Sequence, residues 1–145
     1  MLAKLFKAFV GDKSASDIKE VQPVVDRVKE IEPSLAGLSP DELRALSAEL
    51  RARIQAHVAG QLEHIAQLQS QAAELPLTKL DEKEALFEQV DALELEVNER
   101  LEEILADILP EAFALVKETA RRFAADGAVE VTATEMDREI AANRD

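Results

Sequence analysis

The chain has 145 residues, enough for one domain of ordinary size, and a formal charge of −13, from 17 lysines and arginines against 30 aspartates and glutamates. So acidic a chain should not bind nucleic acid through a broad phosphate-neutralising surface, and any basic patch would have to be local, so nucleic acid is not expected as a partner. It has no cysteine, which excludes disulfides and thiolate metal sites. Glycine and proline are few, while glutamate, alanine and leucine are many, so the composition predicts an all-α fold.

The first ten residues place apolar and basic side chains at helical spacing, and Gly11 follows as a stop signal. They predict a short amphipathic helix that is basic in an otherwise acidic chain. Such a helix suits an anionic membrane surface, and the alternative is a terminal helix that packs on its own domain. No apolar run reaches the roughly 20 residues of a spanning helix, and the start lacks the pattern of a secretory signal. The candidate contact residues are Leu2, Lys4, Leu5, Phe6, Lys7 and Phe9.

A second, short helix is expected next, with Ser14 or Ser16 as its N-cap. Pro23 lies near its first turn. Pro33 is expected to end it, because the residue before a proline is disfavoured in the helical region. The apolar stripe of this helix is Ile18, Val21, Val25, Val28 and Ile31.

Two long helical segments follow, over residues 39–109, and they dominate the chain. Ser39 is a good N-cap for the first, with Pro40 at the first helical position and Glu42 closing a capping box. Each segment carries a narrow apolar stripe, so we predict a coiled-coil-like antiparallel hairpin whose pairing buries both stripes. The stripes are Leu43, Leu46, Leu50, Ile54, Val58, Leu62, Ile65 and Leu68 in the first arm, and Leu86, Val90, Leu93, Val97, Leu101, Ile104 and Ile108 in the second.

The turn of this hairpin is predicted at residues 75–78, after which Thr78 or Asp81 can cap the second arm. Gly60 is a point where the first arm could bend. From Gln61 to Glu111 the sequence has 14 acidic residues against three basic ones, so the hairpin holds most of the negative charge. A solvated outer face explains this charge, and a surface for a basic partner is the alternative.

Beyond the hairpin, Pro110 is expected to begin a further helix, with Lys117, Arg121 and Arg122 towards its end. Residues 129–132 alternate like a short strand that has no partner strand. Thr134 can cap a last short helix before a frayed C-terminal end. We therefore predict three parts, 1–38, 39–109 and 110–145. The apolar side expected for the helix after Pro110 is Ala112, Phe113, Val116, Ala120 and Phe123.

The residues that could carry chemistry do not form a catalytic pattern. There is no glycine-rich phosphate loop. His57 and His64 are two helical turns apart, roughly 10 Å of rise, too far to bind one ion. The glutamates between Glu94 and Glu103 lack the Glu-x-x-His pairs of a di-metal bundle. We therefore expect no catalytic, cofactor-binding or metal site in this chain.

Three blocks of the sequence resemble the N-terminal region of the SecA family, the ATP-driven motors of bacterial preprotein translocation. The first is the amphipathic start with the helix that follows it. The second is Ile-Glu-Pro at 31–33, followed by Leu-Ser-Pro-Asp-Glu-Leu at 38–43 and Ala-Glu-Leu-Arg-Ala-Arg-Ile at 48–54. The third, and most specific, is Leu-Pro-Glu-Ala-Phe-Ala-Leu-Val-Lys-Glu-Thr-Ala-Arg-Arg at 109–122.

The resemblance implies a fragment of that motor. The family places the second and third blocks close together, whereas about 50 residues separate them here, so most of the hairpin is expected to be a lineage-specific insertion. The family's adenine-recognition segment and phosphate-binding loop come after the third block and are not in this chain. The resemblance thus implies ATP and magnesium for a full-length parent, and no ATPase activity for these 145 residues.

The same resemblance implies partners and a location. It favours the membrane interpretation of the first helix, with an anionic membrane surface and the protein-conducting channel as partners and the preprotein bound by other domains. The implied location is cytoplasmic, peripheral on the inner face of the bacterial plasma membrane. Two alternatives remain open from the sequence: a free-standing acidic hairpin adaptor that recruits another protein, and a homodimeric structural protein in which two hairpins form a four-helix bundle.

Overall fold

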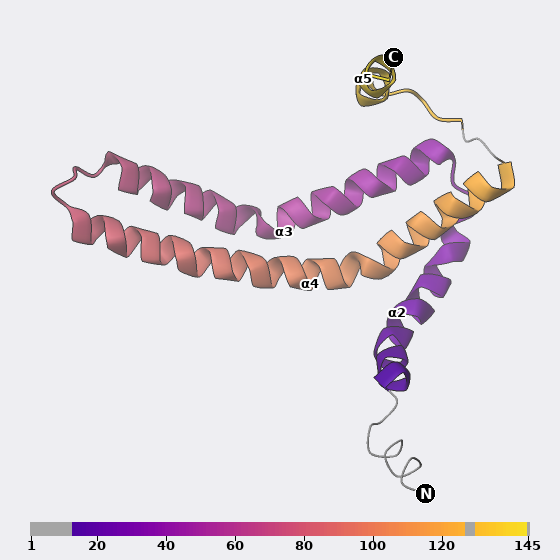
Figure 1. Ribbon diagram of the computed structural model, residues 1–145, viewed down its shortest axis with the longest axis horizontal. Coiled ribbons are helices and arrows are strands. Elements are labelled where there is room, and N and C mark those ends of the chain that lie inside the picture. The colour runs from indigo at the N-terminus through magenta and orange to yellow at the C-terminus, as the bar shows by residue number, and fades with distance from the viewer. Residues whose placement is uncertain (1–12, 127–129, 145) are drawn as a thin grey trace, which may run out of the picture. The chain divides into compact units, whose positions relative to one another are not determined.

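The computed structural model describes residues 13–126 and 130–144, and these form four α-helices and no strand. The helices are α2 (Lys13–Leu35), α3 (Pro40–Glu74), α4 (Leu80–Asp126) and α5 (Glu135–Ala142) (Figure 1). The predicted all-α fold is confirmed. The chain divides into two compact units, Leu46–Leu109 and a second one that joins Met1–Ala45 to Pro110–Asp145.

The first unit is an antiparallel helical hairpin, as the two apolar stripes predicted. Figure 1 shows α3 and α4 side by side in opposite directions. Their polar contacts agree, because partners of residues further along α3 lie earlier in α4. The pairs are Arg53 with Asp107 at 3.1 Å, His57 with Glu103 at 3.6 Å and Gln61 with Glu96 at 2.9 Å.

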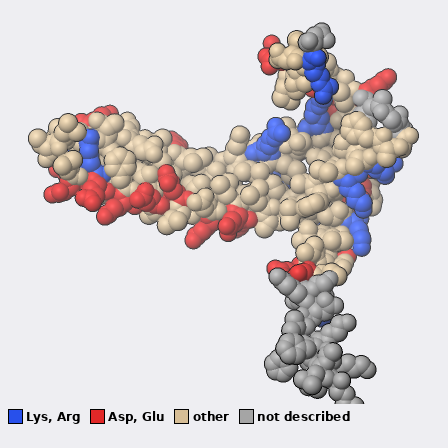
Figure 2. All heavy atoms as spheres, in the orientation of Figure 1, with Lys and Arg blue, Asp and Glu red and all other residues tan. Residues whose placement is uncertain are grey.

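The two apolar stripes meet in the core of the hairpin. Val58, Ile65 and Leu68 of α3 are buried there with Val90 and Val97 of α4. Half-buried leucines of α4 pack against this cluster. Residues on both sides of Gly60 belong to the same helix, α3. Figure 2 shows acidic side chains gathered along the edge that α4 forms. The half-buried leucines are Leu86, Leu93 and Leu101.

The turn of the hairpin uses a different cap from the one expected. Residues 75–79 connect the helices, and the backbone N–H of Lys79 donates to the carbonyl of Pro76 at 3.0 Å. The carbonyl of Lys79 then accepts the N–H of Lys83 at 3.1 Å, so Lys79 holds the N-cap position. The predicted caps, Thr78 and Asp81, are wrong. Asp81 instead lies in the first turn of α4, where a carboxylate favours the helix dipole.

The prediction that Pro110 begins a new helix is also wrong, because α4 continues through it to Asp126. A proline inside a helix removes one backbone hydrogen bond and crowds the carbonyl four residues earlier. Here regular helix on both sides of Pro110 supplies the remaining bonds. One continuous helix therefore leads from the hairpin into the second unit.

Helix α2 extends past both of its expected limits. It begins at Lys13, so Ser14 and Ser16 lie inside the helix and Pro23 is in its interior. Pro33 does not end it either, since the helix runs to Leu35. The hydroxyl of Ser34 donates to the carbonyl of Ile31 at 2.7 Å and satisfies one acceptor of this last turn.

The predicted strand at 129–132 is not formed, as residues 130–134 belong to no helix or strand and Val129 lies outside the described residues. The last helix is confirmed as α5. Thr134 is its N-cap, and Asp137 completes a capping box with it. Within residues 13–126 and 130–144, no helix is long and apolar enough to cross a membrane.

Candidate functional site

A buried carboxylate organises the second unit. Glu118 of α4 has only 6% of its surface exposed, and two arginines of the same helix hold it. Arg121 donates two hydrogen bonds to it, at 2.7 and 2.8 Å, and Arg122 donates one at 2.7 Å. These bonds stabilise the ionised form, so they lower the pKa of Glu118 to about 2, against the opposing effect of burial.

Arg122 also connects α4 to the end of α2. Its Nη2 donates to the backbone carbonyl of Leu35 at 3.0 Å, one of the carbonyls that a helix end leaves without an intrahelical partner. A second bridge lies nearby, where Lys117 Nζ approaches Glu32 Oε1 at 2.7 Å. The arrangement joins the end of α2, which includes Glu32 of the second sequence block, to residues 117–122 of the third.

The buried side of α4 in this unit is not the one that the sequence predicted. Ala114 is fully buried and Glu118 nearly so. Phe113, Val116 and Phe123 were expected on the buried side, yet each exposes more than half of its surface, 56%, 65% and 55%. The prediction assumed that the most apolar stripe of α4 would be buried. Instead, the charged contacts with α2 bury the opposite side of α4, which bears Glu118. Phe113, Val116 and Phe123 thus form an exposed apolar row in the part of the chain that the structure describes.

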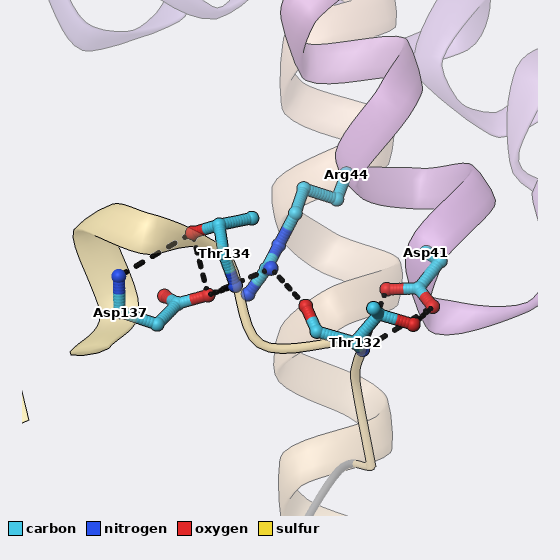
Figure 3. A network of polar contacts seen from close by, with 5 residues as sticks. All are labelled: Asp41, Arg44, Thr132, Thr134 and Asp137. Carbon is cyan, nitrogen blue, oxygen red and sulfur yellow. Dashed lines mark hydrogen bonds and ion pairs between the residues drawn. The ribbon is translucent and has the colours of Figure 1, made fainter.

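A second polar network holds residues 130–137 against the start of α3 (Figure 3). The carboxylate of Asp41 accepts hydrogen bonds from the hydroxyl and the backbone N–H of Thr132, at 2.6 and 3.0 Å. Arg44 donates to the carbonyl of Thr132 and to the carboxylate of Asp137, both at 3.0 Å. Thr134 donates to the same carboxylate from its backbone N–H, at 2.8 Å.

The same bonds perturb the acidity of both aspartates. The Thr132 hydroxyl, and after it the Thr132 backbone N–H, lowers the pKa of Asp41. The Thr134 backbone N–H, followed by its hydroxyl, lowers the pKa of Asp137. Two ionised carboxylates with Arg44 between them hold the segment that the sequence predicted as an unpaired strand.

The start of α3 has the predicted cap. The hydroxyl of Ser39 accepts the N–H of Glu42 at 3.2 Å, and the Glu42 carboxylate accepts the N–H of Ser39 at 2.6 Å. These bonds, the backbone one first, lower the pKa of Glu42. The capping box therefore orients the first turn of α3, which presents Asp41 and Arg44 to residues 130–137.

None of these groups forms a catalytic arrangement. His57 is half-buried beside Glu103 and His64 is exposed elsewhere on α3, so they do not meet. Across residues 13–126 and 130–144 there is no group of three histidine, aspartate or glutamate side chains able to hold a metal ion. The predicted membrane-contact residues, Leu2, Lys4, Leu5, Phe6, Lys7 and Phe9, lie outside the described residues.

The sequence missed both polar networks. Glu118 lies three and four residues before Arg121 and Arg122, a spacing that signals ion pairs on a helix and could have been recognised. The contacts of Arg122 with Leu35 and of Asp41 with Thr132 join residues 87 and 91 positions apart in the sequence, so no local sequence pattern predicts them.

The fold and the networks define a helical scaffold: two helices locked by a buried arginine–carboxylate cluster, continuous with a long hairpin. The chain belongs to the SecA DEAD-like domain family, whose model matches residues 6–134. That match covers all three sequence blocks except the first few residues, and so confirms the resemblance found in the sequence.

Curated relatives are similar along almost the whole chain. The SecA protein translocase subunit of Phocaeicola vulgatus is 44% identical over 141 residues, 97% of this chain. The subunits of Christiangramia forsetii and Porphyromonas gingivalis strain W83 are 44% and 43% identical over 144 residues, 99% of this chain. The chain spans only 12–13% of the length of these relatives.

The coverage also bears on the hairpin. Alignments over 97–99% of the chain must include residues 46–109, so these relatives have a matching segment there. These relatives therefore share the hairpin with this chain. No solved structure matches the chain.

Proposed function

We propose that this chain is the N-terminal part of an ATP-driven motor for preprotein translocation, and that it serves there as a helical scaffold. The observation that carries the proposal is the family match over residues 6–134, together with the translocase names of relatives 37–44% identical to the chain. In the parent protein, ATP and magnesium bind domains beyond these 145 residues, and the chain alone hydrolyses no ATP.

The apolar row on α4 supports a scaffold role. Phe113, Val116 and Phe123 are exposed in the described residues, and an exposed apolar row of this kind is typical of a surface that another domain covers. Glu118 and Arg122 fix the orientation of the helix that bears it. We assign this row to packing against the remainder of the motor.

The basic N-terminal segment is the proposed membrane and channel contact, through Leu2, Lys4, Leu5, Phe6, Lys7 and Phe9. Its lysines would lie at anionic headgroups while its apolar side chains enter the interface. Each cation near such a surface contributes about 1 kcal/mol, so two lysines give weak and salt-sensitive attachment. This attachment puts the protein on the cytoplasmic side of the bacterial plasma membrane.

Co-sedimentation with anionic vesicles tests the membrane contact. We expect Lys4→Glu plus Lys7→Glu to abolish binding at low salt. The matched control, Lys19→Glu plus Lys83→Glu, makes the same change of charge outside the segment and should bind as the parent chain does. Equal binding by both variants would refute the electrostatic contact.

The gene sequence beyond codon 145 tests the motor assignment separately. A glycine-rich loop ending in Gly-Lys-Thr is expected, because that loop binds the phosphates of ATP. A stop codon directly after Asp145 would contradict the assignment and favour a free-standing adaptor.

A further inference from the structure

The outer side of α4 in the hairpin carries exposed apolar side chains among acidic ones. Phe87, Leu95 and Leu105 expose 50%, 67% and 48% of their surface. At 3.6 residues per turn they fall within a sector of about 80° around the helix. This sector lies away from the stripe that packs against α3, which includes Val90 and Val97. We call it the outer face of α4.

Six carboxylates surround these apolar residues, and they are Glu84, Glu88, Asp91, Glu94, Glu99 and Glu102. All six are exposed, and within the described residues none has an ion pair or a side-chain hydrogen bond. The only cation between Glu84 and Leu109 is Arg100, which bonds Glu96 at 2.9 Å and projects from another side of the helix. The outer face therefore has no cation of its own.

This arrangement is unfavourable for the hairpin alone. Glu84 and Glu88 are four residues apart, and Glu88, Asp91 and Glu94 follow at intervals of three. Like charges at these spacings destabilise a helix by about 0.2–0.5 kcal/mol for each pair. Exposed phenylalanine and leucine add unfavourable apolar hydration. The same binding partner would relieve both effects if it were cationic and apolar.

We propose that the outer face of α4 binds a basic amphipathic helix of another protein chain. Leucine-like side chains of that helix would cover Phe87, Leu95 and Leu105, and its lysines or arginines would lie against the surrounding carboxylates. Charge complementarity selects this partner, since the negative field of the face repels nucleic acids and anionic lipid surfaces. The hairpin is thus a recruitment arm, a role that goes beyond the scaffold role proposed above.

A fluorescent peptide of leucine and lysine, about 18 residues long and amphipathic over five helical turns, is the probe. Fluorescence anisotropy measures its binding to the full 145-residue chain at near-physiological salt. Glu88→Gln plus Asp91→Asn plus Glu99→Gln should weaken binding about tenfold. The matched control, Glu20→Gln plus Glu49→Gln plus Glu63→Gln, removes the same charge from exposed positions elsewhere and should change binding less than about twofold.

The apolar part of the face has its own test. Phe87→Ala plus Leu95→Ala should also weaken binding about tenfold, while circular dichroism confirms unchanged helix content. A scrambled peptide of the same composition, without an apolar side, should bind the parent chain weakly. Equal losses of peptide affinity in the outer-face and control triple variants would overturn the proposal. Unchanged peptide affinity in the Phe87→Ala plus Leu95→Ala variant would overturn it as well.

Discussion

Arg122 of α4 donates a hydrogen bond to the backbone carbonyl of Leu35, the last residue of α2, and the same side chain holds the buried carboxylate of Glu118. One guanidinium thus bonds both the free carbonyl at the end of α2 and the buried carboxylate on α4, two helices that lie far apart in the sequence. Its fork of donors makes this geometry accessible to arginine and not to lysine.

Replacing Arg122 with alanine should therefore destabilise the second unit. Loss of the charged hydrogen bond to the Leu35 carbonyl costs about 1.5–3 kcal/mol, before any effect on Glu118. Arg122→Lys should rescue only part of this loss. Urea unfolding measures the change, with Arg51→Ala, an exposed arginine on α3, as a control that stays within about 0.5 kcal/mol of the parent. Similar effects of the two alanine variants would contradict the role of Arg122.

Glu118 predicts a pH dependence of stability. Its pKa is about 2 in the folded chain against an ordinary value of 4.5, so the folded state binds the proton less readily than the unfolded state. The stabilisation is complete above about pH 4.5 and is lost as the pH falls towards 2. The free energies of unfolding of the parent chain and of Glu118→Gln should differ most at neutral pH and become equal in acid. A difference that stays constant from pH 7 to pH 2.5 would refute this.

The hairpin offers a matched pair of leucines for testing its core. Leu68 is 5% exposed in the core of the hairpin, while Leu95 is 67% exposed on α4. Leu68→Ala should lower the free energy of unfolding by about 2–5 kcal/mol, because it leaves a cavity between the helices. Leu95→Ala should change it by less than about 0.5 kcal/mol. Thermal denaturation followed at 222 nm distinguishes them, and a cost at Leu95 comparable to that at Leu68 would contradict the packing described.

The bonds of Asp41 predict a local effect. In Asp41→Ala both bonds to Thr132 are lost, so residues 130–142 should be released while the hairpin is unchanged. Amide hydrogen exchange should then become faster by about tenfold in α5 only. Glu49→Ala, an exposed carboxylate further along α3, is the control and should leave exchange in α5 as it was. Unaltered exchange of α5 in the Asp41 variant would show that the network does not hold it.

The all-α fold and the hairpin could be predicted from the sequence because their determinants are local and periodic. The steps from Val58 to Leu68 and from Val90 to Val97 keep apolar residues on one side of each helix, and pairing of the two helices buries them. The capping box at Ser39 and the N-cap at Thr134 could also be predicted, because both depend on neighbouring residues.

The helix limits predicted at two prolines were wrong. Pro33 and Pro110 disfavour a helix locally, yet α2 and α4 continue through both, because each proline removes one backbone hydrogen bond while the helical turns on either side keep theirs. The buried side of α4 after Pro110 was mistaken for a related reason. Apolar periodicity pointed to Phe113, whereas contacts of Arg122 across 87 positions turn Glu118 inward.

The size and activity of the native protein test the central claim most directly. An antibody raised against the hairpin should isolate, from cells that express this sequence, a polypeptide several times larger than the 16.0 kDa of this chain, because the relatives are that much longer. That polypeptide should hydrolyse ATP faster when preprotein and anionic membranes are added. A native protein of 16 kDa without ATP turnover would contradict the account.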